Sequence, residues 1–316
     1  MEASLARIAP APASFLDDLL EGLGATPKNV PCKYFYDAEG SRLFEAICDL
    51  PDYYQTRTDT ALLAAHANEI AGLAGEAVEI VEFGAGALRK VRILLEALKQ
   101  PAAYTPIDIS GAYLARVTAR LAAEYPRLRL APVTADFTQP LLLPPPGESA
   151  RRIGFFPGGT IGNFAPEAAV LLLRRMRQTL GGGGLLIGVD LVKDPALLHA
   201  AYNDAAGITA RFNKNLLARA NRELGADFEP HAFAHYAPYN AREQRIEMYL
   251  VSLRCQNVTV AGSRFAFAEG EALHTEDSHK YTIESFHDLA VRAGFTPRAA
   301  WTDAERLFSI HWLETR

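Results

Sequence analysis

The sequence lacks several features that mark particular classes of protein. It has no basic run, and its 32 Lys and Arg against 37 Asp and Glu give a net charge of −5, which argues against nucleic acid or an anionic membrane as a partner. No apolar run is long enough to span a bilayer, and the N-terminus lacks the basic and apolar regions of a secretory signal. We therefore expect a cytoplasmic protein.

Cysteines and metal-ligand patterns are also scarce. Cys32, Cys48 and Cys255 lie far apart with no CxxC pair, which fits free thiols in a reducing compartment rather than a disulfide framework. The stretch "HAFAH" (231–235) has two histidines at a spacing that fits one helix face, but no third ligand is evident. The pair in "HTEDSH" (274–279) is equally incomplete, so we expect no metal.

What the sequence does contain is an alternation of strands and helices through its middle. Segments of helical spacing separate compact β-branched runs, and Ser110 is placed to cap one helix. The expected strands are 78–83, 104–109, 128–137, 152–158 and 185–190, and the expected helices are 89–100, 111–126 and 166–180. This order predicts a parallel sheet with helices on both faces, the doubly wound α/β class.

The alternation stops after residue 190. A helical region, 196–225, leads into "RIEMYLVSLRCQNVTV", which alternates like a strand of a mostly antiparallel sheet. A helix with Thr282 as its cap and two closing strands then follow. We predict a core domain of residues 60–195 and 283–316, and a second, α+β domain of residues 1–59 with the insertion 196–282.

Three consecutive strand ends carry residues suited to a nucleoside. Gly84 and Gly86 allow a tight turn after the first strand, and Asp108 lies at the end of the second strand, where an acid commonly takes ribose hydroxyls. Asp136 and Phe137 lie at the end of the third strand and could bind and cover an adenine ring. NAD and S-adenosylmethionine (SAM) both fit this pattern, and the missing third glycine favours SAM.

Two further segments suggest a small polar ligand. "FFPGGTIGNF" places Asn163 beside glycines at the fourth strand end, where it either contacts the ligand or caps the next helix. Near the N-terminus, Tyr34, Tyr36, Tyr53 and Tyr54 form a cluster that is either core or the aromatic wall of an amine pocket.

An ordered set of motifs then connects these segments to a known family. "YFYDAEGSRLFEAICDLPDYYQTRTD", "VEFGAGALRK", "YTPIDIS", "FFPGGTIGNF", "IEMYLVS" and "TEDSHKY" run over nearly the whole chain. Together they resemble the histidine-specific SAM-dependent Nα-methyltransferases, which form hercynine in ergothioneine biosynthesis. The resemblance implies a Rossmann-like class I methyltransferase core, SAM as cofactor with S-adenosylhomocysteine as its product, and L-histidine as substrate. A fungal branch of the family methylates a prenylated tryptophan instead.

The resemblance also assigns roles to individual residues. It implies cofactor contacts at Gly84, Lys90, Asp108, Asp136 and Phe137. It implies amino-acid carboxylate contacts at Tyr53, Asn163 and Tyr202, and a place near the amino group for Tyr36 and the Gly158 backbone. It implies an imidazole pocket lined by Met248, Glu276 and Ser278. The chain departs from relatives in "GAGALRK", which lacks small hydroxylated residues after the second glycine, and in Asp277 and His279 of "EDSHK".

The residues of the last motif are also chemically suited to bind an imidazole ring. On an extended strand Glu276 and Ser278 point to one face and Asp277 to the other. Neutral imidazole needs an acceptor for its N–H and a partner for its bare nitrogen, which a carboxylate and a hydroxyl supply. A ring without nitrogens would leave the buried carboxylate unpaired, so histidine is favoured over tryptophan.

Methyl transfer to an amine sets the remaining expectations. The α-amine must lose a proton, to water or to Tyr36, and three transfers would leave a trimethylammonium with no lone pair. We expect Tyr36 and Asn163 to act at the reacting amine of a monomeric enzyme. The alternatives are methylation of another amine such as a tryptophan derivative, an NAD-dependent oxidoreductase, and a non-catalytic protein that binds the same ligands.

Overall fold

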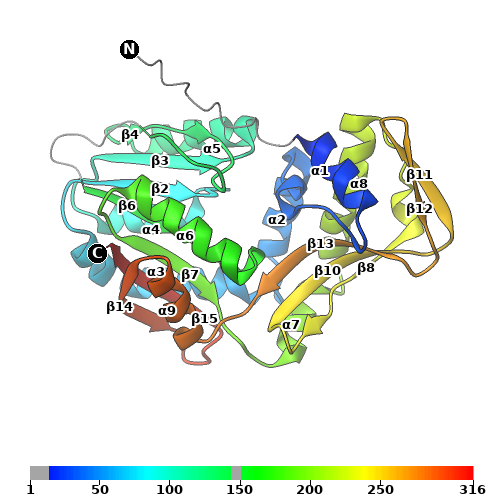
Figure 1. Cartoon of the computed structure of the whole chain (residues 1–316). Helices are drawn as coiled ribbons and strands as arrows, with labels where there is room; N and C mark the ends of the chain where they lie inside the picture. Colours follow the sequence, from blue (N-terminus) through cyan, green and yellow to red (C-terminus); the bar gives the residue numbers. More distant parts are fainter. Residues whose placement is uncertain (1–13, 144–150, 316) are drawn as a thin grey trace, which may run out of the picture.

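The computed structural model describes residues 14–143 and 151–315, so much of the N-terminal stretch, in which no secretory signal is expected, lies outside the described residues. Two sheets dominate these ranges, a large one and a smaller one, and they lie at opposite ends of the molecule in Figure 1. Within the same ranges no helix is long and apolar enough to cross a membrane. All three cysteines are free thiols, as expected.

The large sheet has the order β14-β15-β7-β6-β2-β3-β4, with β5 also pairing with β3 (Figure 1). Its described strands are β2 (Val78–Phe83), β3 (Ala103–Asp108), β4 (Arg129–Leu130), β5 (Val133–Thr134), β6 (Arg151–Phe156), β7 (Leu185–Asp190), β14 (Phe295–Thr302) and β15 (Phe308–Thr315). β2 to β7 pair in parallel, whereas β15 is antiparallel to β7 and β14. The strand order reverses at β2, so the carboxyl ends of β2 and β6 flank a crevice suited to a ligand.

Helices cover both faces of this sheet, which confirms the doubly wound prediction. One face carries α3 (Tyr54–Ala74), α4 (Arg89–Ala97) and α5 (Gly111–Glu124), and the other carries α6 (Pro166–Leu180) and α9 (Ile283–Arg292). Local signals set several ends: α6 begins with a proline and ends at Gly181 in the left-handed region, and Thr282 forms a capping box for α9. Ser110 stands at the N-cap of α5, but its side chain makes no capping bond.

The third strand was predicted too long. The segment 128–137 forms only β4 and β5, two short pieces separated at Ala131 and Pro132. Proline has no N–H to donate to a neighbouring strand, so the ladder is interrupted there. The chain resumes pairing with β3 before it reaches Asp136.

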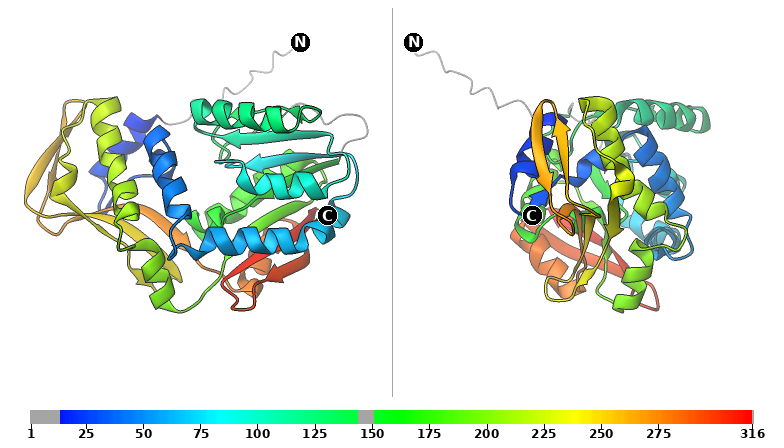
Figure 2. Two further views of the ribbon diagram at one scale, coloured as in Figure 1. Left: turned by 180° about the vertical axis from the view of Figure 1, so that it is seen from behind. Right: turned by 90° about the vertical axis from the view of Figure 1, so that its right-hand side faces the viewer.

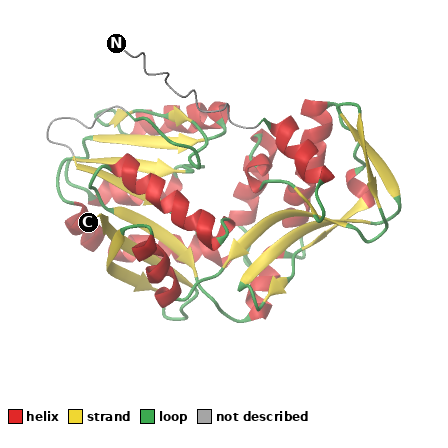
Figure 3. Cartoon of the chain, in the orientation of Figure 1, coloured by secondary structure: helices red, strands yellow, loops and turns green. Residues whose placement is uncertain are grey.

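The smaller sheet belongs to a second unit that packs around its own core (Figure 3). Its order is β1-β13-β10-β8 with β9 on β10, and a separate two-stranded sheet lies beside it. The strands are β1 (Lys28–Asn29), β8 (Phe233–Tyr236), β9 (Tyr239–Asn240), β10 (Arg245–Ser252), β11 (Gln256–Val260), β12 (Ser263–Phe267) and β13 (Ala272–His279). The helices are α1 (Phe15–Gly24), α2 (Ala38–Cys48), α7 (Pro195–Tyr202) and α8 (Ile208–Leu224), with 3-10 turns η1 (Cys32–Phe35) and η3 (Pro230–Ala232). A further 3-10 turn, η2 (Thr160–Asn163), follows β6 and packs Ile161 into the core of the large sheet.

The N-terminal segment packs with the inserted segment. One hydrophobic cluster joins Leu19, Phe35 and Leu43 to side chains of α7, α8, β10 and β13. The back view in Figure 2 shows α3 running from this unit along the large sheet, so the predicted boundary at residues 59 and 60 lies within a continuous helix.

Two local predictions in the insertion were wrong. "RIEMYLVSLRCQNVTV" is two strands, β10 and β11, which belong to different sheets and are separated by a bend at Leu253 to Cys255. "HAFAH" is not helical, because His231 lies in η3 and His235 in β8. The ring nitrogens of His235 lie 2.9 Å from Asn213 Nδ2 and 2.9 Å from the Tyr202 carbonyl oxygen, so the ring has a structural role.

Candidate active site

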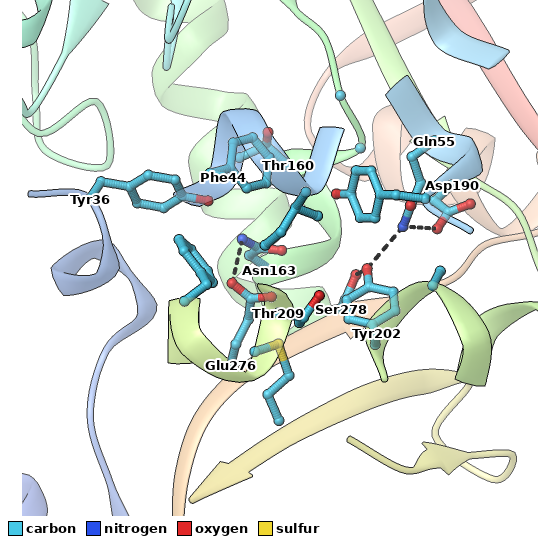
Figure 4. Close-up of a pocket in the computed structure, with 17 residues that line it drawn as sticks. Tyr36, Phe44, Gln55, Thr160, Asn163, Asp190, Tyr202, Thr209, Glu276 and Ser278 are labelled. Atoms are coloured by element: carbon cyan, nitrogen blue, oxygen red, sulfur yellow. Dashed lines mark hydrogen bonds between the residues drawn. The ribbon is translucent and has the colours of Figure 1, made fainter. Parts of the chain in front are cut away.

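A pocket lies where the carboxyl edge of the large sheet meets the smaller sheet (Figure 4). All of the residues predicted for the amino acid line it: Tyr36, Tyr53, Gly158, Asn163, Tyr202, Met248, Glu276 and Ser278. They come from segments far apart in the sequence, namely the residue after η1, the start of α3, the loop after β6, α7, β10 and β13. The fold therefore assembles the predicted set at one place.

A bulge in β13 aims its side chains. Met248 of β10 pairs with Glu276, but Tyr249 pairs with His274, so Thr275 is an extra residue. Beyond the bulge, Glu276 and Ser278 face the pocket and are 9% and 6% exposed. His274 and Asp277 meet on the other face, with 2.9 Å between His274 Nε2 and Asp277 Oδ1. That histidine therefore has a partner outside the pocket.

A buried hydrogen-bond network, which we call the polar wall, consists of Gln55, Asp190, Tyr202, Ser278 and Lys280. Gln55, Asp190 and Tyr202 lie in the right-hand part of Figure 4, and Lys280 joins them through its hydrogen bonds to Tyr202 and Ser278. Tyr202 Oη lies 2.7 Å from Ser278 Oγ and accepts from Gln55 Nε2 at 3.1 Å. Lys280 Nζ donates to Ser278 Oγ at 2.7 Å and pairs with Asp190 Oδ2 at 2.8 Å. The network fixes the position of the Ser278 hydroxyl.

Glu276 has no such support. Its side chain has one hydrogen bond among the described residues, which Asn163 Nδ2 donates to Glu276 Oε2 at 3.5 Å, a long distance for such a bond. Burial raises the pKa of Glu276 to about 8, although the charge of Lys280 opposes this shift. The carboxyl group is thus buried with unused hydrogen-bonding capacity, which suits a group that receives a polar ligand.

Opposite the polar wall stands an aromatic wall, defined here as Tyr36, Phe44, Tyr53 and Phe212. The ring centroids of Tyr36 and Phe44 are 5.7 Å apart, and those of Phe44 and Phe212 are 6.0 Å apart. Burial raises the pKa of Tyr36 well above its ordinary value, and the nearby Glu276 adds to the shift. Tyr36 therefore stays a phenol at neutral pH, which argues against the expectation that it takes a proton from the substrate.

The predicted cofactor residues lie along the carboxyl ends of β2, β3 and β5. Asp108 joins two loops, because Gly86 N–H donates to its Oδ2 at 3.1 Å and Ser110 N–H donates to its Oδ1 at 2.8 Å. Gly84 has φ of +71°, and a Cβ there would lie 3.2 Å from the Phe137 ring. Only glycine fits that close approach without strain, and this edge fits a nucleoside ligand.

The remaining cofactor candidates are partly engaged with the protein itself. Asp136 Oδ1 accepts from the Thr138 backbone N–H at 2.9 Å, which shapes the loop that carries Phe137. Lys90 forms an ion pair with Asp59, whose Oδ2 also accepts from Gly158 N–H at 2.9 Å. The Gly158 N–H is therefore already bonded, and only its carbonyl oxygen can serve a substrate amine.

Other pocket residues were missed by sequence reasoning. They are Phe44, Ile47, Gln55, Gly159, Thr160, Asp190, Ala201, Thr209 and Phe212. Asp190 carried a usable signal, because it ends β7 on the same edge as Asp108 ends β3. The helical members carried none. In the described ranges no cluster of three or more His, Cys, Asp or Glu is arranged to hold a metal ion.

Comparison with known proteins identifies the family. The model of the family described as "Histidine-specific methyltransferase, SAM-dependent" matches residues 15–315. A Histidine N-alpha-methyltransferase of Mycolicibacterium smegmatis is 42% identical over 93% of this chain and 92% of its own, and that of Mycobacterium tuberculosis is 39% identical with the same coverage. Ergothioneine biosynthesis protein 1 of Neurospora crassa is 30% identical over 91% of this chain and 33% of its own. With the nucleoside edge and pocket in place, these matches show that the chain belongs to the histidine-specific, SAM-dependent methyltransferases.

Proposed function

We propose that this protein transfers three methyl groups from SAM to the α-amino group of L-histidine, giving Nα,Nα,Nα-trimethylhistidine (hercynine) for ergothioneine biosynthesis. The observation that carries the proposal is the Glu276 and Ser278 pair, buried on one strand face in a pocket at the nucleoside edge. Membership in a SAM-dependent family excludes the nicotinamide alternative. The names of the relatives support histidine as substrate and ergothioneine as the pathway.

The imidazole ring would lie between Glu276, Ser278 and Met248. The Glu276 carboxyl would accept from one ring N–H, and Ser278 would bind the other nitrogen. Indole offers a single N–H and is larger, so a tryptophan derivative would leave part of this pair unused. We therefore propose histidine rather than tryptophan.

The amino-acid end would lie toward Tyr53, Asn163 and Tyr202, and the Tyr53 hydroxyl and the Asn163 amide can donate hydrogen bonds to its carboxylate. The amine would face the aromatic wall, and Tyr36 Oη would accept from an amine N–H as a neutral phenol. Aromatic faces attract quaternary ammonium groups, so this wall suits each product up to the trimethylated one. Transfer then ends because the nitrogen has no lone pair left.

Catalysis in this proposal is mainly positioning. SAM supplies an activated methyl group when bound, and the chain holds the amine in line with it, an effect worth up to about 7–11 kcal/mol. The raised pKa of Tyr36 leaves no phenolate to act as a base, so the substrate proton leaves to water. Asn163 orients the amino acid from the loop that also carries Gly158.

We further propose a division of labour between the two units. Residues 60–195 and 283–316 would hold SAM through Gly84, Lys90, Asp108, Asp136 and Phe137, while residues 1–59 and 196–282 would supply most of the histidine site. We propose that the enzyme acts as a monomer. A cytoplasmic location agrees with the free thiols.

A substrate panel tests the proposal. Purified protein with SAM is offered histidine, its mono- and dimethyl forms, and tryptophan, and products are identified by mass spectrometry. Trimethylhistidine should accumulate from each histidine form. Preferred turnover of tryptophan would overturn the substrate assignment, and binding of histidine and S-adenosylhomocysteine without any turnover would favour a non-catalytic binding protein.

A further inference from the structure

Lys280 sits behind the pocket and uses every hydrogen it has. Its side chain is fully buried, and an ammonium group has three N–H donors and no acceptor. Its three partners are Ser278 Oγ at 2.7 Å, Tyr202 Oη at 3.0 Å and Asp190 Oδ2 at 2.8 Å. Burial lowers the pKa of Lys280, but Asp190 more than restores it, so the group stays charged. Both hydroxyl groups must therefore accept from Lys280.

Tyr202 has little freedom left after that. A phenol oxygen has two acceptor positions and one hydrogen. Lys280 Nζ fills one position and Gln55 Nε2, at 3.1 Å, fills the other. The short contact of 2.7 Å between Tyr202 Oη and Ser278 Oγ can then only be a hydrogen bond donated by Tyr202.

These two bonds determine how the Ser278 hydroxyl can bond. Its oxygen accepts from Lys280 and from Tyr202, which fills both of its acceptor positions. Its own hydrogen points to the pocket. No described residue accepts it there, so it is free to bond to a ligand. We propose that Lys280 is a positioning residue that makes the Ser278 hydroxyl a hydrogen-bond donor, and not an acceptor, toward the substrate.

This polarity selects one form of the substrate ring. The inference rests on the proposed histidine substrate. A donor at Ser278 requires a bare ring nitrogen facing it, so the ring N–H must face Glu276. The imidazolium form carries N–H groups on both nitrogens and would oppose the Ser278 hydrogen. The site should therefore bind neutral imidazole as a single tautomer.

Nitrogen NMR of bound histidine tests this directly. Histidine labelled with ¹⁵N in its ring is bound to the protein with S-adenosylhomocysteine, which prevents turnover, at about pH 6, below the ordinary imidazole pKa of about 6.5. We expect one protonated and one unprotonated ring nitrogen. Two protonated nitrogens, or averaging between tautomers, would overturn the proposal. Absence of histidine binding would instead count against the proposed function.

A matched pair of lysine variants isolates Lys280. Lys193 is also buried and lies 2.6 Å from Asp190 Oδ1, but it has no contact with Ser278 or Tyr202. Lys280→Met should mix the tautomers of bound histidine and raise its KM roughly tenfold, with little change in KM for SAM. Lys193→Met should keep the wild-type spectrum.

Equal spectra for Lys280→Met and the wild type would contradict the inference. Loss of the single tautomer in both lysine variants would also contradict it, because it would assign the effect to Asp190. If Lys280→Met does not fold, Tyr202→Phe serves instead, since it removes one of the two donors to Ser278 and should also mix the tautomers.

Discussion

The two faces of β13 carry similar residue types in very different states. On the outer face, Asp277 has His274 at 2.9 Å and Arg245 at 3.2 Å as partners. On the pocket face, Glu276 has only a 3.5 Å contact with Asn163. One carboxylate is thus satisfied by the protein and its neighbour is not. A buried polar group without partners costs stability, so its presence indicates that a ligand completes it.

The same contrast recurs elsewhere around the pocket. Lys280 contacts the pocket hydroxyls whereas Lys193 binds only behind them. Phe44 lines the pocket, whereas Phe35 packs behind Phe212, with ring centroids 4.7 Å apart. Each pair sets a residue that faces the ligand against a similar one that faces away, which provides matched controls for function and stability.

The largest effect is expected for the carboxylates. Glu276→Ala removes the acceptor for the ring N–H and should lower kcat/KM for histidine about 100-fold, because leaving that buried N–H unpaired costs up to about 3 kcal/mol. KM for SAM should change little. Asp277→Ala, on the outer face, is the control and should stay within about twofold of the wild type for histidine. Equal losses of kcat/KM in both variants would contradict the difference between the two faces of β13.

A smaller effect is expected at the aromatic wall. Phe44→Leu keeps an apolar side chain but removes one ring face beside the amine, and should slow the third transfer by several-fold, about 1 kcal/mol of cation–π attraction. Dimethylhistidine should accumulate in a time course followed by mass spectrometry. Phe35→Leu should cost stability without changing the product distribution. An unaltered distribution in Phe44→Leu would remove the aromatic wall from the account.

The smallest effect concerns stability and pH. The folded-state pKa of Glu276, about 8, is above its ordinary value of 4.5, so the folded state binds more protons and stability is lost as pH rises between those values. Glu276→Gln should therefore raise the free energy of unfolding most above pH 8, and by progressively less toward pH 4.5. Denaturant unfolding across this range measures the difference.

Asp277 should show the opposite sign. Burial raises the pKa of Asp277, but His274 and Arg245 outweigh burial and bring the pKa below the ordinary value of 3.8. Its contribution is therefore present above pH 3.8 and is lost as pH falls through the folded-state pKa. Asp277→Asn should lower stability at neutral pH. The same sign in both variants would contradict the contrast between the two faces.

Much of the fold was predictable because local signals agreed with it. β-branched runs and glycine stops placed β2, β7 and α6 correctly, and Thr282 marked the start of α9. The length predicted for the third strand was wrong because Pro132 interrupts the pairing that the surrounding pattern predicts. The two strands of "RIEMYLVSLRCQNVTV" were merged because alternation continues across the bend, whereas sheet membership depends on distant partners.

The candidate site was predictable in part. Strand ends pointed to Asp108 and to the Asn163 loop, and spacing placed Glu276 and Ser278 on one face; most of the other pocket residues came from the family resemblance. Gln55, Thr209 and Phe212 reach the pocket from helices whose sequences give no local sign of it. The role of Lys280 depends on counting hydrogen bonds among three separate segments, which only the folded structure brings together.

The central claim is that the pocket face of β13 recognises ring nitrogens. The most direct test compares kcat/KM for L-histidine with that for 3-(2-thienyl)-L-alanine, whose five-membered ring has no nitrogen. A site built to hydrogen-bond a ring should reject an analogue without those groups by roughly 10⁴-fold. We predict a ratio of that order. Methylation of thienylalanine within about tenfold of histidine, the range left to shape alone, would contradict the account.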